Sequence, residues 1–250
     1  MRVIHALGLA AAVLCGAARA DGLADLKGAL GRMQAHTPVK ATLETRTWRK
    51  VGEGKEAEEF NGAATITVED GGQGLRLQYP RDLLARLDAE NQGTAKNPNA
   101  KTPTIYALRE VGPDDLRPMT SAAEALARNV ERTVYKSEKP ATHNGKPARL
   151  LTFSVPINTL SDRQRKHLKE FEGTLEVWIG AEGTPLASRL DLHGSGRAFV
   201  VVSFEFRQEE QCTYALSGDR LLMTRNEKKI FNAGAGEKSE ERMVRTLQAG

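Results

Sequence analysis

Residues 132–155 read RTVYKSEKPATHNGKPARLLTFSV, and this stretch decides the fold class. At its centre is Asn144-Gly145, the strongest short hairpin signal, because both residues tolerate a positive φ. The flanking runs 132–138 and 148–155 are rich in residues that favour strands. The stretch therefore predicts two antiparallel strands joined by a tight turn.

The chain after this hairpin continues with the same strand pattern. Apolar residues alternate with polar ones in two places, at Leu175, Val177 and Ile179, and again at Val200, Val202, Phe204 and Phe206. Turn-forming residues at 181–185, Gly194–Gly196 and 217–219 separate the expected strands. A capping box at Ser161–Gln164 predicts a charged helix that reaches about Phe171.

The chain before the hairpin predicts a helix and a meander. Leucines at spacings of three and four predict an amphipathic helix over 23–33, and strands follow at 39–51, 60–69 and 75–79. Pro80 opens a short Leu-rich helix, and a polar loop is expected from Asn91 to Pro103.

These elements amount to about ten strands with a few helices. We expect a β-rich α+β fold, a strongly curved antiparallel sheet or incomplete β-barrel with helices packed on its concave side. Residues 21–231 would form a single domain with a helical and loop insertion at about 80–131. Residues 232–250 are expected to be a charged C-terminal tail with a short helix at Met243, Val244 and Leu247.

The N-terminal segment has the pattern of a signal peptide. Arg2 precedes an apolar run to Ala18, and Ala18-Arg19-Ala20 fits the small-x-small rule for cleavage between Ala20 and Asp21. We therefore expect a periplasmic or secreted protein, with no transmembrane segment in the mature chain.

Composition argues against nucleic acid as a partner. The chain has 36 Lys and Arg against 32 Asp and Glu, and the two signs are mixed along it. No aromatic residues interleave with the basic cluster at 163–166, as single-strand binding requires. We expect no nucleic-acid partner.

No motif predicts catalysis, a metal site or a cofactor. The histidines of the mature chain, His36, His143, His167 and His193, lack metal-ligand spacing. Cys212 shares a predicted strand face with apolar residues, so an inert buried thiol is expected. A hydrolase would need His193, Ser195 and a carboxylate in one cleft, and the sequence has no Gly-x-Ser-x-Gly elbow. We expect a protein that is not an enzyme.

The order of features resembles the LolA/LolB-like family of periplasmic lipoprotein carriers. The resemblance rests on a signal peptide, a Leu-rich helix at Leu23–Met33 and the meander from Val39. It extends through Asn144-Gly-Lys-Pro-Ala-Arg-Leu-Leu-Thr-Phe153, Leu175-Glu-Val-Trp-Ile179 and Gly183-Thr-Pro-Leu186. It implies an incomplete barrel whose helices close a cavity for acyl chains.

That resemblance, together with the aromatic and leucine residues, gives a set of expected site residues. An arginine early in the meander, Arg46 or Arg49, is expected to hold the helical lid. The ligand-cavity candidates are Trp48, Leu77, Tyr79, Leu83, Leu84, Leu87 and Trp178. Trp178 is singled out because it lies on the opposite strand face from Val177 and Ile179.

The expected function is non-catalytic binding of a lipid, a lipoprotein or another apolar ligand in the half-barrel cavity. The alternative is an interaction or scaffold module of the cell envelope, with a filled core, a protein partner and no ligand.

Overall fold

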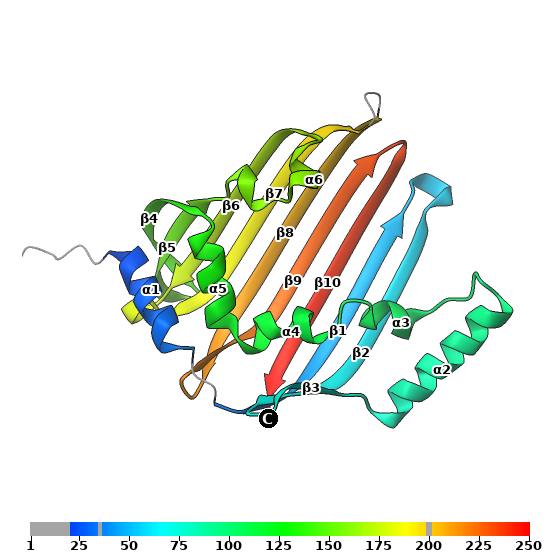
Figure 1. Ribbon diagram of the computed structural model, residues 1–250, viewed down its shortest axis with the longest axis horizontal. Coiled ribbons are helices and arrows are strands. Elements are labelled where there is room, and N and C mark those ends of the chain that lie inside the picture. Colours follow the sequence, from blue (N-terminus) through cyan, green and yellow to red (C-terminus); the bar gives the residue numbers. More distant parts are fainter. Residues whose placement is uncertain (1–20, 35–36, 199–201) are drawn as a thin grey trace, which may run out of the picture.

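The computed structural model describes residues 21–34, 37–198 and 202–250, and one antiparallel sheet organises them (Figure 1). The signal peptide expected at residues 1–20 lies outside the described residues, as does His36. The ten strands are β1 (Val39–Val51), β2 (Glu58–Gly71), β3 (Gly74–Gln78), β4 (Val134–His143), β5 (Lys146–Ser154), β6 (Leu168–Ile179), β7 (Pro185–Ala198), β8 (Val202–Ser217), β9 (Arg220–Gly234) and β10 (Glu237–Ala249).

The order of the strands across the sheet is β3-β2-β1-β10-β9-β8-β7-β6-β5-β4. Two meanders, β1–β3 and β4–β10, therefore meet where β1 pairs with β10, the strand that comes last in the chain. The expectation of a β-rich fold built on an antiparallel sheet is confirmed. The sheet does not close, because β3 and β4 remain its two edges.

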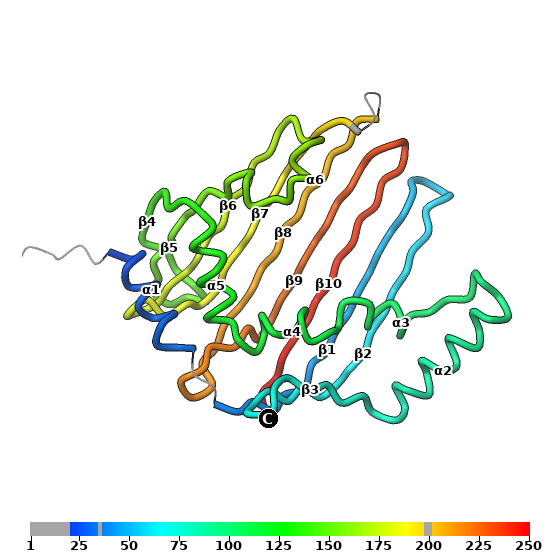
Figure 2. Tube along the Cα trace, viewed as in Figure 1, coloured from blue at the N-terminus to red at the C-terminus, as the bar shows by residue number. Residues whose placement is uncertain are grey.

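The α-helices are α1 (Gly22–Arg32), α2 (Arg81–Lys96), α3 (Pro103–Leu108), α4 (Pro113–Thr120), α5 (Ala122–Glu131) and α6 (Asp162–Arg165). Helices α1, α3, α4, α5 and α6 lie on one face of the sheet, which we call the helix-bearing face (Figure 1); the opposite side is the outer face. In Figure 1, α1, α5, α4 and α3 form a row across one half of the strands, and α6 lies toward the other end. The trace in Figure 2 shows α2 extending past the β2–β3 edge. No helix in the described part of the chain is long and apolar enough to span a membrane.

Strand alternation and amphipathic helices build the core between these layers. Along β1 every second residue from Val39 to Thr47 is buried, which is the period of a strand with one covered face. Helix α1 is capped by the Asp21 carboxylate, which accepts hydrogen bonds from the amides of Leu23 and Ala24, and it buries Leu26 and Leu30. Helix α3 approaches β2 at Gly62, where an added Cβ would lie 2.5 Å from the Pro103 carbonyl oxygen.

Local turn signals are confirmed where they depend on the backbone alone. Asn144 and Gly145 have φ values of 49° and 74° and join β4 to β5, as the hairpin signal predicts. Ser161 and Gln164 form the predicted capping box of α6. The helix itself ends at Arg165 rather than near Phe171, because β6 begins at Leu168.

The expectation for residues 232–250 is wrong. They form the end of β9 and the whole of β10, which lies inside the sheet between β1 and β9. The spacing of Met243 and Leu247 fits a helix as well as a strand, but Arg245 between them is also buried, which gives the two-residue period of a strand. Ala235 and Gly236, both at positive φ, provide the hairpin turn that precedes β10.

The loop expected from Asn91 to Pro103 is shorter than predicted. Helix α2 continues to Lys96, and α3 begins at Pro103. The Glu90 carboxylate accepts hydrogen bonds from the amides of Thr104 and Ile105, so it caps the start of α3 from the neighbouring helix.

Candidate ligand-binding cavity

A cavity of about 790 Å³ lies on the helix-bearing face, at the end of the strands away from the row formed by α1, α5, α4 and α3. Strands β1, β7, β8, β9 and β10 contribute its floor, and the segment that contains α6 forms a wall. Its volume falls within the range of about 300–1,000 Å³ that is usual for small-molecule sites.

Four apolar side chains form the centre of the cavity floor, beside the polar side chains of Gln208, Asn232 and Ser239 on the same strands. Phe204 and Phe206 of β8 line it, together with Leu192 of β7 and Ile230 of β9. Strand register places these side chains on the same face as buried Cys212, farther along β8. The apolar side chains of the helix-bearing face therefore continue to the cavity end of the strands, which α1, α5, α4 and α3 do not cover.

Two glycines of β7 make room for the phenylalanine rings. Gly194 pairs with Phe206, and a Cβ there would lie 2.4 Å from the ring; Gly196 pairs with Phe204, and a Cβ there would lie 2.0 Å from the His167 carbonyl oxygen. The turn predicted at Gly194–Gly196 is therefore wrong: the glycines lie within β7. They serve close packing against rings and backbone rather than a change of chain direction.

Charged side chains surround the apolar floor. Arg49 of β1, Arg163 of α6 and Lys238 of β10 are the basic residues of the lining, and the register places the Lys238 side chain on the outer face, in one row with Ala233 and Glu205. Lys238 forms an ion pair with Glu53 at 2.5 Å, and this interaction raises the lysine pKa. Glu205, whose carboxylate lies on the outer face beside His193, is bound by Arg207 at 2.7 Å, and the hydrogen bond from Arg207 holds the pKa of Glu205 below its usual value.

Three of the residues predicted for the site lie on the outer face instead. Trp48 and Arg46 alternate with the buried residues of β1, and Trp178 alternates with Val177 and Ile179. Trp48 donates a hydrogen bond from Nε1 to Glu59 on β2 at 3.4 Å. These side chains do not line the cavity described above.

The predicted residues of β3 and α2 lie at the other end of the molecule. Leu83 is fully buried in the main core, and Leu77 and Tyr79 pack against that core. Leu87 is half-buried, whereas the side chain of Leu84 is 45 % exposed. Among the predicted cavity and lid residues, Arg49 alone lines the cavity in the described part of the chain.

Two buried arginines of the C-terminal strands attach the helices to the sheet. Arg220 of β9 is 3 % exposed, donates from Nε to the Thr120 carbonyl at 2.6 Å, and forms an ion pair with Asp70. It also donates to the Thr37 carbonyl at 3.0 Å. Arg220 thus joins the α4–α5 junction to the ends of β1, β2 and β9.

Arg245 of β10 performs a similar role farther along the row of helices. It is 6 % exposed and donates to the carbonyl oxygen of Glu110, between α3 and α4. Arg109, just after α3, forms an ion pair with Glu241 of β10 at 2.6 Å. Arg149 of β5 adds a third such contact, at 2.7 Å from Asp25 of α1. These sheet-to-helix arginines lie in β5, β9 and β10, whereas the sequence analysis expects one in the first meander.

The residues that a hydrolase would need do not form a catalytic arrangement. His193 lies 3.5 Å from Glu205, whereas Ser195 donates to Glu170 at 3.2 Å, and both side chains are on the outer face. Among the described residues, no hydrogen bond joins His193 to Ser195. The described chain also contains no group of three or more His, Cys, Asp or Glu side chains that could hold a metal ion.

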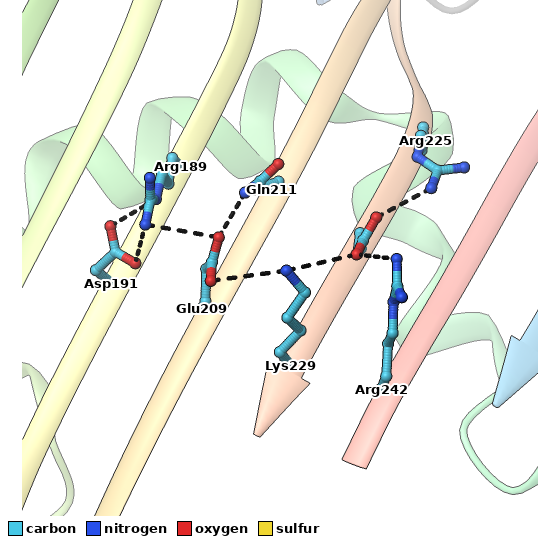
Figure 3. A network of polar contacts seen from close by, with 8 residues as sticks. Arg189, Asp191, Glu209, Gln211, Arg225, Lys229 and Arg242 are labelled. Atoms are coloured by element: carbon cyan, nitrogen blue, oxygen red, sulfur yellow. Dashed lines mark hydrogen bonds and ion pairs between the residues drawn. The ribbon is translucent and has the colours of Figure 1, made fainter. Parts of the chain in front are cut away.

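The outer face carries a chain of ion pairs across four strands (Figure 3). Arg189 contacts Asp191 at 2.8 Å and Glu209 at 3.6 Å, and Lys229 lies 3.8 Å from Glu209. Glu227 completes the series, with Arg242 at 2.6 Å, Arg225 at 3.0 Å and Lys229 at 3.7 Å. This surface is strongly polar, in contrast to the cavity floor on the other side of the same strands.

The sequence shows the alternation of Phe204 and Phe206, but no local motif assigns these residues to a site. The signal that could have found the cavity is the pair Gly194 and Gly196 opposite two phenylalanines on the next strand. This signal can be recognised only when the β7–β8 register is known, and a turn predicted at the two glycines gives no such register.

Comparison of the chain with protein-family models, with curated proteins and with solved structures gives no significant match in any of the three.

Proposed function

We propose that this protein is a non-catalytic carrier or binding protein that holds an apolar ligand, such as an acyl chain of a lipid or lipoprotein, in the cavity beside α6. The observation that carries the proposal is the apolar floor of Phe204, Phe206 and Ile230 within a cavity of about 790 Å³. A concave site with apolar walls and a few polar groups is the usual form of a small-molecule site.

The proposal includes the compartment and the curvature expected from the sequence. A signal peptide at residues 1–20 would deliver the chain outside the cytoplasm, where lipids and lipoproteins in transit need a carrier. Curvature of the sheet toward its helix-bearing face, as in a half-barrel, would deepen the cavity around the ligand.

The first test is native mass spectrometry of protein purified without detergent, followed by lipid extraction. A stoichiometric lipid would support the proposal. A protein that is empty and also fails to take up a fluorescent acyl probe would contradict it, and would favour the interaction module with a protein partner.

A pair of matched variants locates the binding site. Phe206→Ser should weaken binding of the acyl probe by about tenfold or more, because burial of one phenylalanine against a ligand is worth about 2 kcal/mol. Phe231→Ser is the control, since Phe231 lies on β9 at the same level but on the outer face. Equal losses in both variants would show that the probe does not bind in this cavity.

A further inference from the structure

The charges around the cavity are not equally satisfied. Lys238 and Glu205 project to the outer face, where they are paired with Glu53 and Arg207. Arg49 and Arg163 have no ion-pair partner within 4.0 Å among the described residues, which leaves two guanidinium groups at a site whose remaining carboxylate is Glu237.

The carboxylates nearest to Arg49 and Arg163 in the strand pairing and in the sequence form ion pairs with other arginines. Glu241 is the cross-strand partner of Arg49, but its carboxylate binds Arg109 at 2.6 Å. Asp162 precedes Arg163, and its carboxylate binds Arg165. The local acidic groups therefore do not neutralise Arg49 or Arg163.

The two arginines come from different sides of the apolar floor. Arg49 belongs to β1, whereas Arg163 belongs to α6, which leads into β6. Strands β10, β9 and β8, with Ile230 and Phe204, lie between them in the sheet order. An apolar chain on this floor would place a polar end beside a guanidinium group.

We infer that the ligand is a single-chain amphiphile with an anionic headgroup, whose chain lies on the floor formed by Phe204, Phe206 and Ile230 and whose headgroup binds the guanidinium group at either side of that floor, Arg49 or Arg163. Guanidinium binds carboxylate and phosphate through paired hydrogen bonds, and near an apolar surface it does so more strongly than in water. This inference rests on the proposed function, because it assigns a headgroup to the ligand of the same cavity.

The experiment compares three amphiphiles of equal chain length by displacement of a fluorescent acyl probe: palmitate, the neutral alcohol cetyl alcohol and the cationic cetylamine. Wild-type protein should bind palmitate about tenfold more tightly than cetyl alcohol, and cetylamine least well. Added sodium chloride should weaken palmitate binding and leave cetyl alcohol unaffected.

Variants assign the preference to the two arginines. Arg49→Gln and Arg163→Gln should each reduce the preference for palmitate, and the double variant should abolish it while binding of cetyl alcohol is retained. Arg46→Gln is the matched control for β1 because Arg46 lies on the outer face, and Lys166→Gln is the control for α6 because Lys166, at the end of that helix, does not line the cavity. Both controls should keep the wild-type preference.

The outcomes separate the inference from the function on which it rests. Equal binding of palmitate and cetyl alcohol, or an unchanged preference in the double variant, would overturn the anionic headgroup and leave the apolar cavity standing. Failure of all three amphiphiles to bind would overturn both. Lysophosphatidic acid and inorganic phosphate provide the last comparison: binding of the lysolipid alone supports the inference, and equal binding of free phosphate contradicts it.

Discussion

At the scale of single residues, Cys212 shows how burial controls chemistry. Its side chain is 6 % exposed, and burial raises the pKa of the thiol to about 11, with the charge of Glu210 adding to the effect and the Asn226 hydrogen bond opposing it. The nucleophilic form of cysteine is the thiolate, so the native thiol should be almost inert at neutral pH.

The first prediction concerns this thiol. Native protein at pH 8 should react with iodoacetamide more than about a hundredfold more slowly than protein unfolded in guanidinium, because a pKa near 11 leaves a very small thiolate fraction. Mass spectrometry after timed alkylation measures both rates. Rapid modification of the native chain would show that Cys212 is accessible and ionised.

The second prediction concerns the contribution of Arg220 to stability. Arg220→Met should lower the free energy of unfolding by about 3–5 kcal/mol, because it removes one partner of a buried ion pair and leaves the Asp70 carboxylate and three backbone carbonyls without their donor. Arg225→Met, on the exposed side of the same strand, should cost about 1 kcal/mol or less. Urea denaturation compares the two.

The same arginine permits a check of the cause. In the double variant Arg220→Met with Asp70→Asn, part of the loss should be recovered, since the carboxylate no longer lies beside the apolar core without a counter-charge. A double variant as unstable as the sum of the single variants would show that the Arg220–Asp70 pair is not coupled.

At the scale of elements, the ion pairs across β7–β10 give a pH-dependent prediction. Burial alone would raise the pKa of Glu227, but the hydrogen bond from Arg225 and the charges of Arg242 and Lys229 together hold it below its usual value of 4.5. A carboxyl group whose pKa is lowered on folding contributes stability above its unfolded pKa and loses that contribution as the pH falls through the folded value.

Glu227→Gln should therefore destabilise the protein by about 1 kcal/mol at pH 7. The difference from wild type should persist down to about pH 5 and shrink as the pH falls below 4.5. Urea denaturation at a series of pH values measures it. A difference that stays constant from pH 7 to pH 3 would assign the loss to packing rather than to charge.

Elements with local signals could be predicted from the sequence, and those defined by distant partners could not. The β4–β5 hairpin and α1 follow from Asn144-Gly145 and from the leucine spacing. Gly194 and Gly196 carry the local signature of a turn, and only the rings of Phe204 and Phe206 on the next strand explain them.

The cavity was not predictable for a related reason. Its floor joins β1 to β7–β10, so it exists only because β10 pairs with both β1 and β9. If residues 232–250 formed a tail, no strand would join β1 to β9, and nothing in the sequence would predict that Arg49 and Ile230 line one cavity. The expectation that Trp48 and Trp178 line a site depended on strand faces, which alternation fixes relative to neighbouring residues but not relative to the helices.

At the scale of the whole molecule, β10 holds the two meanders together. Its pairs reach from Ala41↔Ala249 to Val51↔Ser239 on one side and include Arg242↔Lys229 on the other. Deletion of residues 237–250 should abolish cooperative unfolding, because two strand edges would lose their hydrogen bonds and Met243, Arg245 and Leu247 would leave the core. Thermal denaturation followed by circular dichroism provides the measurement.

A synthetic peptide of residues 237–250 tests the same prediction in reverse. Added to the truncated chain, it should restore a cooperative transition by adding a strand between β1 and β9. A truncated protein that unfolds cooperatively without the peptide would show that the meanders hold together by their helices alone.

The position of β10 also affects the chain while it is being synthesised. A chain made from its N-terminus presents the bare edges of β1 and β9 for as long as residues 237–249 have not emerged, and such edges invite pairing with other chains. The two edges become paired only after β10 has been synthesised, so a chain that lacks β10 carries the aggregation risk of two open strand edges.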